Sequence, residues 1–457
     1  MKRFLFLLML MSFYVTCGCV ASYTDRVITA RRDFYAGNLE SAKKQFDSRL
    51  KKGKKKETDL IKLENAVVDM SEGRFSEAKR ALIEVRDSFD HLEQKSLAEN
   101  TLSLWTDDTM VSYPGEDYEK VMIRAFLAIC DLMEGGSDAE AFALQVVEKQ
   151  QQIRSTAEKA GPKKTNGSRS ADLQEKDSHP KLAYKQVPFG PYIRGLIREE
   201  TLTNFDDALR YYTMVEEWEP GFQQVKHDIR RVKAGHHHME GNGVVYVFTL
   251  VGRGPYKERE NAEATQLALL IADQIFSATN KYSVPPTLAP VPIPAVKRYF
   301  DAIHNVGIEV NGSRLGATET ITDIGQMAEE QFEAIRHQII ARAVVRRIVK
   351  KGSVYAAKNA ADVNPWISLA MDAGGVAWEA METADTRCWG LLPDRIQVAR
   401  LELPEGTHTL KLRSLTGRDL TLGERSYPVE IHVRNGYNTY VFANFPSKNL
   451  VGRVSVR

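Results

Sequence analysis

Cysteine is scarce in this sequence, with four residues among 457, and two of them, Cys17 and Cys19, follow the N-terminal apolar run. The other two, Cys130 and Cys388, are too few for the disulfide framework on which small exported domains depend. From the sequence, these two can either form one bridge or stay as two buried thiols. The fold must therefore be held by packed apolar cores.

Long apolar runs and an excess of one charge are also missing. After the N-terminal run, no stretch of roughly 18 consecutive apolar residues occurs, so no spanning helix is predicted there. The 62 Lys and Arg residues nearly cancel the 60 Asp and Glu residues, which argues against a nucleic-acid-binding protein. With 43% apolar residues over 457 positions, we expect two or three domains.

Recognisable catalytic motifs are absent too. The chain has no Gly-x-Ser-x-Gly nucleophile motif, and the His236-His237-His238 run has no further ligand at a standard metal-site spacing. Three adjacent side chains cannot all face one ion on a regular element, so we interpret this run as a polar loop. We therefore expect no catalytic residue, no metal and no cofactor.

A short glycine-rich stretch, Gly252-Arg253-Gly254, follows an expected strand. It lacks the third glycine of a dinucleotide fingerprint and the Gly-Lys-Ser/Thr of a P-loop. Pro255 also removes an amide that would hold a phosphate. We interpret the stretch as a turn, with an anion-binding loop as the alternative.

The N-terminus has the three zones of an export signal. Lys2 and Arg3 are followed by an apolar core and then by small residues, and the core is too short to span a bilayer. Gly18 before Cys19 resembles the bacterial lipobox, in which the cysteine is acylated and becomes the new N-terminus. The resemblance implies a lipoprotein signal peptide over residues 1–18 and lipidation at Cys19.

Thr16 and Cys17 depart from the usual lipobox, so a soluble exported protein cut nearby is the alternative. Val20 stands where an inner-membrane retention signal would have Asp. The lipobox resemblance therefore favours a protein anchored to the outer membrane and facing the periplasm, over the inner membrane or the cell surface.

A repeat is visible in the first half. Residues 30–46 match residues 66–82, with a Gly followed five positions later by Ala in both (Gly37 and Ala42, Gly73 and Ala78). Two less regular units follow, one with Gly136 and Ala141 and one with Thr203 and Ala208. The pattern resembles the tetratricopeptide repeat (TPR) and predicts a TPR-like helical solenoid over 19–235, interrupted by a polar, flexible insertion at about 154–185.

The second half changes to strand-like patterns, so we expect an α+β multidomain fold. Residues 240–390 are predicted to form a mixed α/β domain, with strands at 243–251 and 307–312, helices at 260–279 and 321–351, and extended chain at 283–294. Residues 391–457 alternate apolar and polar residues. They predict a small antiparallel sheet or sandwich, either separate or one unit with 240–390, with hairpins pairing 396–403 with 407–412 and 427–433 with 439–443.

Asp385, Arg387 and Trp389 occupy alternate positions and would share one face of an extended segment. A buried Asp–Arg pair at the junction of helix and sheet is one interpretation. A ligand-binding ledge is the other.

Several segments resemble a family of bacterial lipoproteins whose role is not established. They are Pro-Gly-Glu-Asp-Tyr-Glu-Lys-Val (114–121), Pro-Phe-Gly-Pro-Tyr (188–192), Val-Val-Tyr-Val with Gly-Arg-Gly-Pro, and Ala-Asp-Thr-Arg-x-Trp-x-Leu-Leu-Pro-Asp (384–394). The resemblance covers most of the mature chain and implies envelope proteins as partners, among them the peptidoglycan-synthesis machinery or its activators.

Three functions follow as hypotheses, of which the third is a purely structural envelope lipoprotein. The first is a lipid-anchored scaffold that binds another protein through its repeats. The second is a module in the C-terminal half that binds or processes peptidoglycan or another glycan, with Asp385, Arg387 and the Gly252 loop in its site. A concave pocket around these residues would favour the second hypothesis, and a closed Asp–Arg ion pair would favour the first.

Overall fold

The computed structural model describes residues 22–98, 111–160, 186–277, 289–360 and 384–457. Cys19 and the predicted signal peptide lie outside these ranges, as do residues 161–185 of the predicted insertion. Residues 154–160 continue a helix, so that part of the insertion prediction is wrong. In the described ranges, helices fill the N-terminal half and mixed sheets with antiparallel strands fill the C-terminal part, which confirms an α+β layout. No helix found there is both long and apolar enough to cross a membrane.

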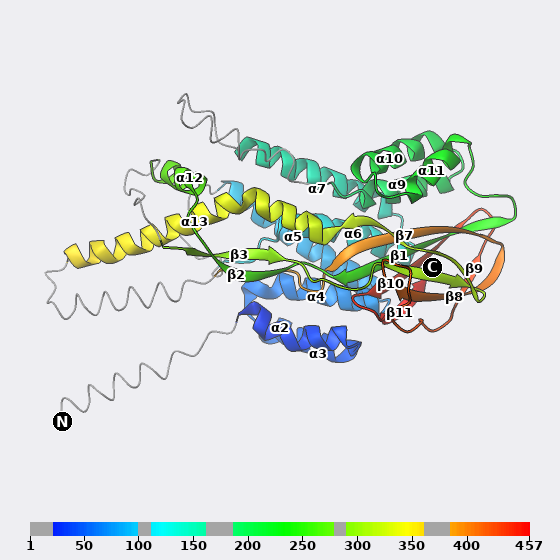
Figure 1. Cartoon of the computed structure of the whole chain (residues 1–457), viewed down its shortest axis with the longest axis horizontal. Helices are drawn as coiled ribbons and strands as arrows, with labels where there is room; N and C mark the ends of the chain where they lie inside the picture. The colour runs from blue at the N-terminus through cyan, green and yellow to red at the C-terminus, as the bar shows by residue number, and fades with distance from the viewer. Residues whose placement is uncertain (1–21, 99–110, 161–185, 278–288, 361–383) are drawn as a thin grey trace.

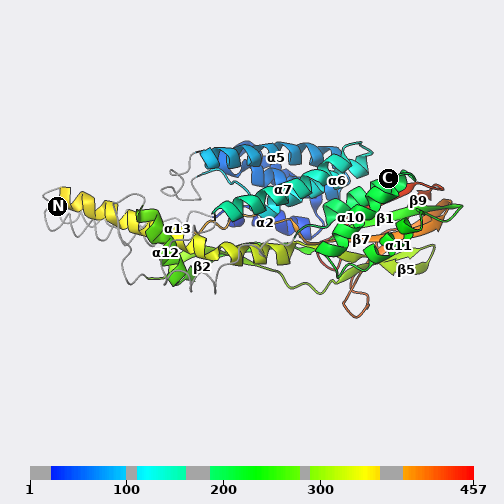
Figure 2. The same cartoon turned by 90° about the horizontal axis from the view of Figure 1, so that it is seen from above.

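Helices of the N-terminal half form one layer in which each packs against the next along the chain. They are α2 (Tyr23–Tyr35), α3 (Leu39–Lys52), η1 (Lys55–Glu57), α4 (Thr58–Ser71), α5 (Phe75–Ala98), α6 (Asp117–Glu134), α7 (Ala139–Ala160), α9 (Phe189–Glu200), α10 (Phe205–Trp218) and α11 (Gln224–Lys233). Figure 2 shows α5, α6 and α7 side by side in this layer.

The first two predicted hairpins are found. Gly37 and Gly73 lie between paired helices with φ of +83° and +72°, a backbone region that glycine enters without a Cβ clash. Ala42 and Ala78, in the second helix of each pair, have no exposed surface. The small side chain thus lets the two helices approach closely.

The third and fourth hairpins differ from the prediction. The left-handed residue after α6 is Gly135 and not Gly136, and Ala141 is exposed while Ala143 is buried. The turn is longer than in the first two units, which shifts the buried face. In the fourth unit, Leu202 takes the positive φ of +60°.

Strands of the second half form a two-layer sandwich. A five-stranded sheet has the order β11-β10-β1-β7-β6 and a four-stranded sheet the order β5-β4-β8-β9. Their bounds are β1 (Asn242–Arg253), β4 (Asn305–Val310), β5 (Ser313–Ala317), β6 (Glu319–Asp323), β7 (Pro393–Pro404), β8 (Gly406–Leu415), β9 (Val429–Val433), β10 (Asn438–Phe445) and β11 (Val451–Val456). β1 is parallel to β10 and antiparallel to β7.

Both predicted hairpins of the C-terminal part are wrong. β7 pairs with β1 and β6, whereas β8 pairs with β4 and β9. β9 lies in the four-stranded sheet, and β10 joins β1 and β11 in the other. The chain changes sheets at Gly406 and near Gly436, which both have positive φ. Alternation fixes which face of a strand is buried, but it does not name the neighbouring strand.

Central strand β1 is covered on both faces, as its continuous apolar sequence indicates. Tyr246 and Phe248 belong to the core shared with the helices, while Val245 and Val247 belong to the core between the two sheets. Aromatic pairs join helix to sheet, with ring centroids 5.4 Å apart for Phe75–Phe442, 5.9 Å for Phe189–Phe248 and 6.4 Å for Tyr192–Tyr246.

The remaining elements form an arm, namely β2 (Tyr256–Ala262), α12 (Gln266–Ser277), β3 (Val291–Lys297) and α13 (Ile324–Ala360). β2 and β3 make a two-stranded ribbon that shares a separate core with α12 and α13. Figure 1 shows the arm extending from the sandwich beyond the helical layer. Residues 260–262 are therefore the end of strand β2 where the start of a helix was expected, and the Asn311-Gly312 turn links β4 and β5.

Candidate functional site

Residues 384–392, which we call the strap, lead into β7 and lie against α4 and α6 of the helical layer. Trp389 in the strap is 1% exposed, and its ring packs edge-to-face on Phe126 of α6 at 5.3 Å. The most distinctive predicted segment therefore lies at an internal junction.

Asp385 and Arg387 of the strap form a closed ion pair. Arg387 Nη2 lies 2.7 Å from Asp385 Oδ2, and Arg387 Nε donates to Asp385 Oδ1 at 2.9 Å. Arg387 Nη1 also donates to the carbonyl oxygen of Val111 at 2.9 Å. Burial acts to raise the pKa of Asp385, but the hydrogen bonds and charge of Arg387 outweigh it and leave that pKa lowered. The pair fits the structural interpretation of these residues.

Buried Glu64 of α4 holds the strap and was not identified from the sequence. Its side chain has no exposed surface and accepts hydrogen bonds from the amides of Gly390 at 3.2 Å and Leu391 at 2.9 Å. Arg31 Nη2 lies 2.5 Å from the same carboxylate. Arg31 also donates to the carbonyl oxygen of Cys388 at 3.1 Å, so strap, α2 and α4 are joined at one point.

Glu119 of α6 is a second buried carboxylate at the strap. It accepts hydrogen bonds from the Trp389 amide at 2.8 Å, the Glu116 amide at 3.0 Å and the Tyr113 hydroxyl at 2.7 Å. Burial, reinforced by the charge of Glu116 and opposed by Lys257, raises the pKa of Glu119 from 4.5 to about 7. Neither glutamate stands out in the sequence, because Lys62 and Asn65 flank Glu64, and Glu119 follows Glu116 and Asp117 at an acidic helix start.

A cavity of about 260 Å³ lies beside the Asp385–Arg387 pair. Its wall combines Lys257 and Arg342 with aromatic residues, including Phe332. Lys257 forms an ion pair with Glu116 in the same wall. The cavity is lined by charged side chains of both signs and by apolar side chains, which suits a small amphipathic ligand.

The Gly252-Arg253-Gly254 stretch does not line that cavity. Gly252 has a φ of +75° at the end of β1, and the Gly254 amide donates to the Leu392 carbonyl oxygen at 2.8 Å. Gly252 and Arg253 therefore belong to strand β1, whose pairing with β7 reaches Arg253 and Pro393, and the predicted turn is wrong for these residues. The Arg253 guanidinium lies 4.3 Å from the ring centroid of Tyr35.

An aromatic surface includes this arginine. We use this name for Tyr35, Arg253, Tyr256, Tyr299 and Phe300. The rings of Tyr256 and Tyr299 lie 4.4 Å apart, and Arg253 lies 5.8 Å from the Tyr299 centroid. Tyr299 is 42% exposed, and Phe300 is fully exposed at 104%.

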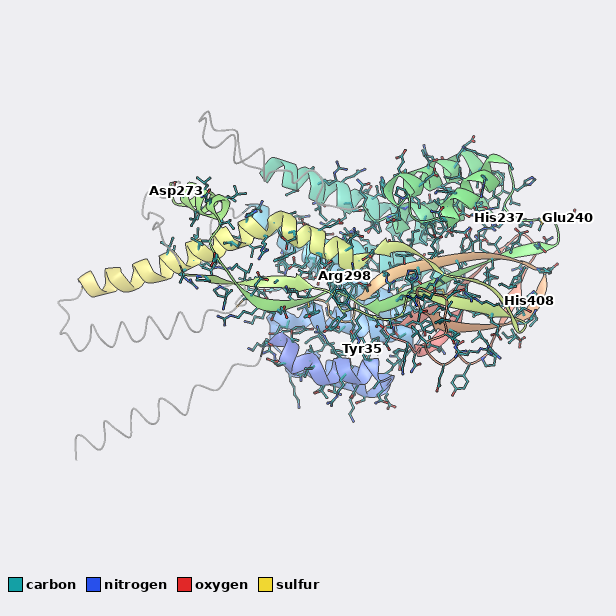
Figure 3. The ribbon with its side chains drawn as sticks, viewed as in Figure 1. Tyr35, His237, Glu240, Asp273, Arg298 and His408 are labelled. Carbon is teal, nitrogen blue, oxygen red and sulfur yellow. The ribbon has the colours of Figure 1, made fainter. Side chains whose placement is uncertain are left out.

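The base of this surface is fixed to the sandwich and the strap. Arg298, next to Tyr299 in the chain, pairs with Asp323 and Asp394 at 2.9 Å each. The Tyr35 hydroxyl donates to the carbonyl oxygen of Gly390 at 3.0 Å. Figure 3 shows Tyr35 and Arg298 near the middle of the molecule, where the helices, the arm and the sandwich meet.

The histidine run is part of a structural contact. His237 is 2% exposed, and its Nε2 lies 3.0 Å from Asn438 Oδ1 at the start of β10. Burial and the charge of Arg400 lower the pKa of His237 to about 4, so the ring is neutral at pH 7. Within the described ranges, no group of three or more His, Cys, Asp or Glu side chains is arranged to hold a metal ion.

Both remaining cysteines are buried free thiols. Cys130 lies in α6 and Cys388 in the strap. Burial raises the pKa of each thiol. The bridge that the sequence left open is not formed.

Comparisons with protein-family models, with curated proteins and with solved structures each found no match for this chain.

Proposed function

We propose that this protein is a lipid-anchored component of the bacterial envelope, tethered through Cys19, that binds a second protein. The export signal and lipobox-like residues before Cys19 support the anchor. The proposed location is the periplasmic face of the outer membrane. The proposed partners are envelope proteins, including the peptidoglycan-synthesis machinery or its activators, to which the lipoprotein resemblance points.

The inner side of the helical layer is not a free docking groove. Nearly every residue of α4 and α6 is buried, between neighbouring helices on one side and the sheet or strap on the other. If the hairpins are TPR-like, they serve chiefly as a frame on which the sandwich is mounted. A partner would therefore bind the outer face of the helices or another surface of the protein.

The observation that carries the proposal is the full exposure of Phe300, which follows Tyr299 in the chain, and the Tyr299 ring lies 5.8 Å from the Arg253 guanidinium. Aromatic residues and arginine are enriched at the centres of protein interfaces, where a few of them supply most of the binding free energy. An exposed phenylalanine costs free energy in water. The neighbouring Arg298 ion pairs fix the base of its loop, so little ordering free energy would be lost on binding.

Glycan binding in the C-terminal half is the second proposal. It is supported by the cavity beside Asp385 and Arg387. Two observations weaken it. Asp385 and Arg387 are already paired with each other. The Gly252 loop does not line the cavity, and its Gly254 amide is bonded to the Leu392 carbonyl oxygen.

Affinity capture from crosslinked native membranes tests the first proposal. Wild type is compared with Phe300→Asp and with Tyr427→Asp, a matched control in which the exchanged aromatic residue is 90% exposed in the segment before β9. We expect one dominant protein partner that is retained by the control and lost in Phe300→Asp. Equal capture by all three proteins, or no protein partner, would overturn the proposal. Glycan capture that is abolished by Arg387→Lys in a folded protein would instead favour the second proposal.

A further inference from the structure

A dense run of positive charge lies between α3 and α4. Six of the eight residues at 49–56 are Lys or Arg, and none is acidic. Arg49, Lys51 and Lys52 occupy the last turn of α3, where cations stabilise the helix dipole. Lys54, Lys55 and Lys56 lie beyond the helix end, so the dipole does not account for them.

Four of these cations point to solvent without an internal partner. Lys51, Lys52, Lys54 and Lys55 are exposed, and no ion pair or side-chain hydrogen bond joins them to a residue of the described ranges. Lys43 of the same helix, by contrast, lies 2.5 Å from Asp69. The exposed lysines repel one another, and an external anion would relieve that repulsion.

The surface beside this run is hollowed. A cavity of about 580 Å³ lies between the start of α2 and the end of α3, and its wall includes Lys44, Arg49, Lys52 and Lys54. Among the described residues of that wall, Glu57 is the one carboxylate, and it is paired with Arg26. The hollow is therefore positive and large enough for the phosphate of a lipid headgroup.

This basic surface lies where the chain leaves the expected anchor. Ser22 caps α2 and follows Cys19 by three residues, a span of at most roughly 11 Å when extended. The Arg26–Glu57 ion pair ties the start of α2 to the basic run. If Cys19 carries the lipid, as proposed above, the exposed lysines are held at the bilayer surface.

We propose that residues 49–56 and the adjoining hollow form a binding site for anionic phospholipid headgroups in the bilayer that carries the anchor. Each lysine near an anionic leaflet adds attraction, and several together add to the hold of an acyl anchor. The lipid fixes the protein to the membrane. The basic surface sets which end of the molecule faces it.

Vesicle co-sedimentation tests the site separately from the anchor. The probe protein is the whole chain that follows Cys19, exported without a lipid. The vesicles are phosphatidylcholine alone or phosphatidylcholine with about 30% phosphatidylglycerol, at about 0.1 M salt. The test variant replaces Lys51, Lys52, Lys54 and Lys55 by Gln. The control replaces four exposed cations far away in the sequence by Gln, namely Lys226, Arg230, Arg418 and Lys448.

We expect the unlipidated wild type and the control to bind the anionic vesicles and to release them at high salt. We expect the test variant to bind about tenfold more weakly or worse. Equal binding by test and control variants, equal binding to both vesicle types, or no binding at all would overturn the site. Intact mass of the N-terminal peptide from membranes tests lipidation by itself. A missing acyl mass would refute the anchor without changing the vesicle result.

Discussion

The backbone amide of Trp389 donates a hydrogen bond to the Glu119 carboxylate at 2.8 Å, across 270 positions of sequence. Glu64 accepts the Leu391 amide in the same way. Extended chain has amides that must find acceptors when it is buried, and two helical glutamates provide them here. The strap thereby fixes the beginning of β7 against α4 and α6, and couples the helical layer to the sandwich.

Removal of Glu64 is expected to destabilise the protein strongly. Glu64→Ala would remove the carboxylate that pairs with Arg31 and would leave the Gly390 and Leu391 amides without their acceptor. Loss of one partner from a buried ion pair typically costs about 3–5 kcal/mol. Denaturant unfolding of wild type and variant measures the difference.

Glu84→Ala is the matched control for that experiment. Glu84 also forms an ion pair, with Lys62 at 2.7 Å, but its side chain is 52% exposed. Surface pairs contribute about 1 kcal/mol or less. Equal losses in the two variants would show that burial of Glu64 in the strap contact has no special importance.

Titration of Glu119 should make stability depend on pH. Its pKa is raised from 4.5 to about 7 in the folded protein, so the folded state binds more protons than the unfolded state between these values. Preferential protonation of Glu119 in the folded state contributes fully to the free energy of unfolding below pH 4.5. It falls as pH rises through 7, by on the order of 3 kcal/mol.

Glu119→Gln removes that titration. The stability advantage of wild type over this variant should therefore shrink as pH rises from 4.5 to 8. The other titratable groups are the same in both proteins, so their contributions to the difference in free energy of unfolding cancel. Unfolding curves of both proteins across this range provide the measurement. A constant difference between them would contradict the assigned pKa.

Leu202→Gly should stabilise the fourth hairpin. Leu202 has a φ of +60° and is 50% exposed, so it bears the strain of the left-handed region and buries only part of its side chain. That strain costs roughly 1–2 kcal/mol, against a glycine entropy cost of roughly 0.5–1 kcal/mol. We expect a small net gain in the midpoint of thermal unfolding. Gly37→Leu, at a corresponding turn with a φ of +83°, should show a loss.

Both thiols should be unreactive in the folded protein. Cys130 and Cys388 are buried and free, and burial raises their pKa values, which leaves little thiolate to react. Maleimide labelling of the chain that follows Cys19 should modify neither residue before unfolding and both after it. Rapid labelling of Cys388 in native buffer would indicate that the strap opens.

Local sequence patterns predicted where helices and strands form better than they predicted which strands pair. The Gly–Ala spacing located the turns at Gly37 and Gly73, and the apolar run at 243–251 located β1. The pairing of β7 with β1 was missed because alternation is the same whichever strand lies alongside. The chain changes sheet at Gly406, which a hairpin interpretation treats as an ordinary turn.

The candidate site was predicted only in part. The sequence suggested both an ion pair and a ligand ledge for Asp385 and Arg387, and the structure has the ion pair. Glu64 and Glu119 were missed because their partners are backbone amides far along the chain, which no side-chain pattern identifies. Phe300 lies between β3 and β4 and belongs to no local motif, so no sequence pattern indicated its exposure.

In-cell photocrosslinking at position 300 tests the central claim most directly. A photoreactive phenylalanine analogue replaces Phe300 in one strain and Tyr427 in another, and the crosslinked products are identified by mass spectrometry. The account predicts one dominant envelope protein crosslinked from position 300 and absent from position 427. Identical product patterns from both positions, or no protein product from position 300, would contradict a protein-binding role for the aromatic surface.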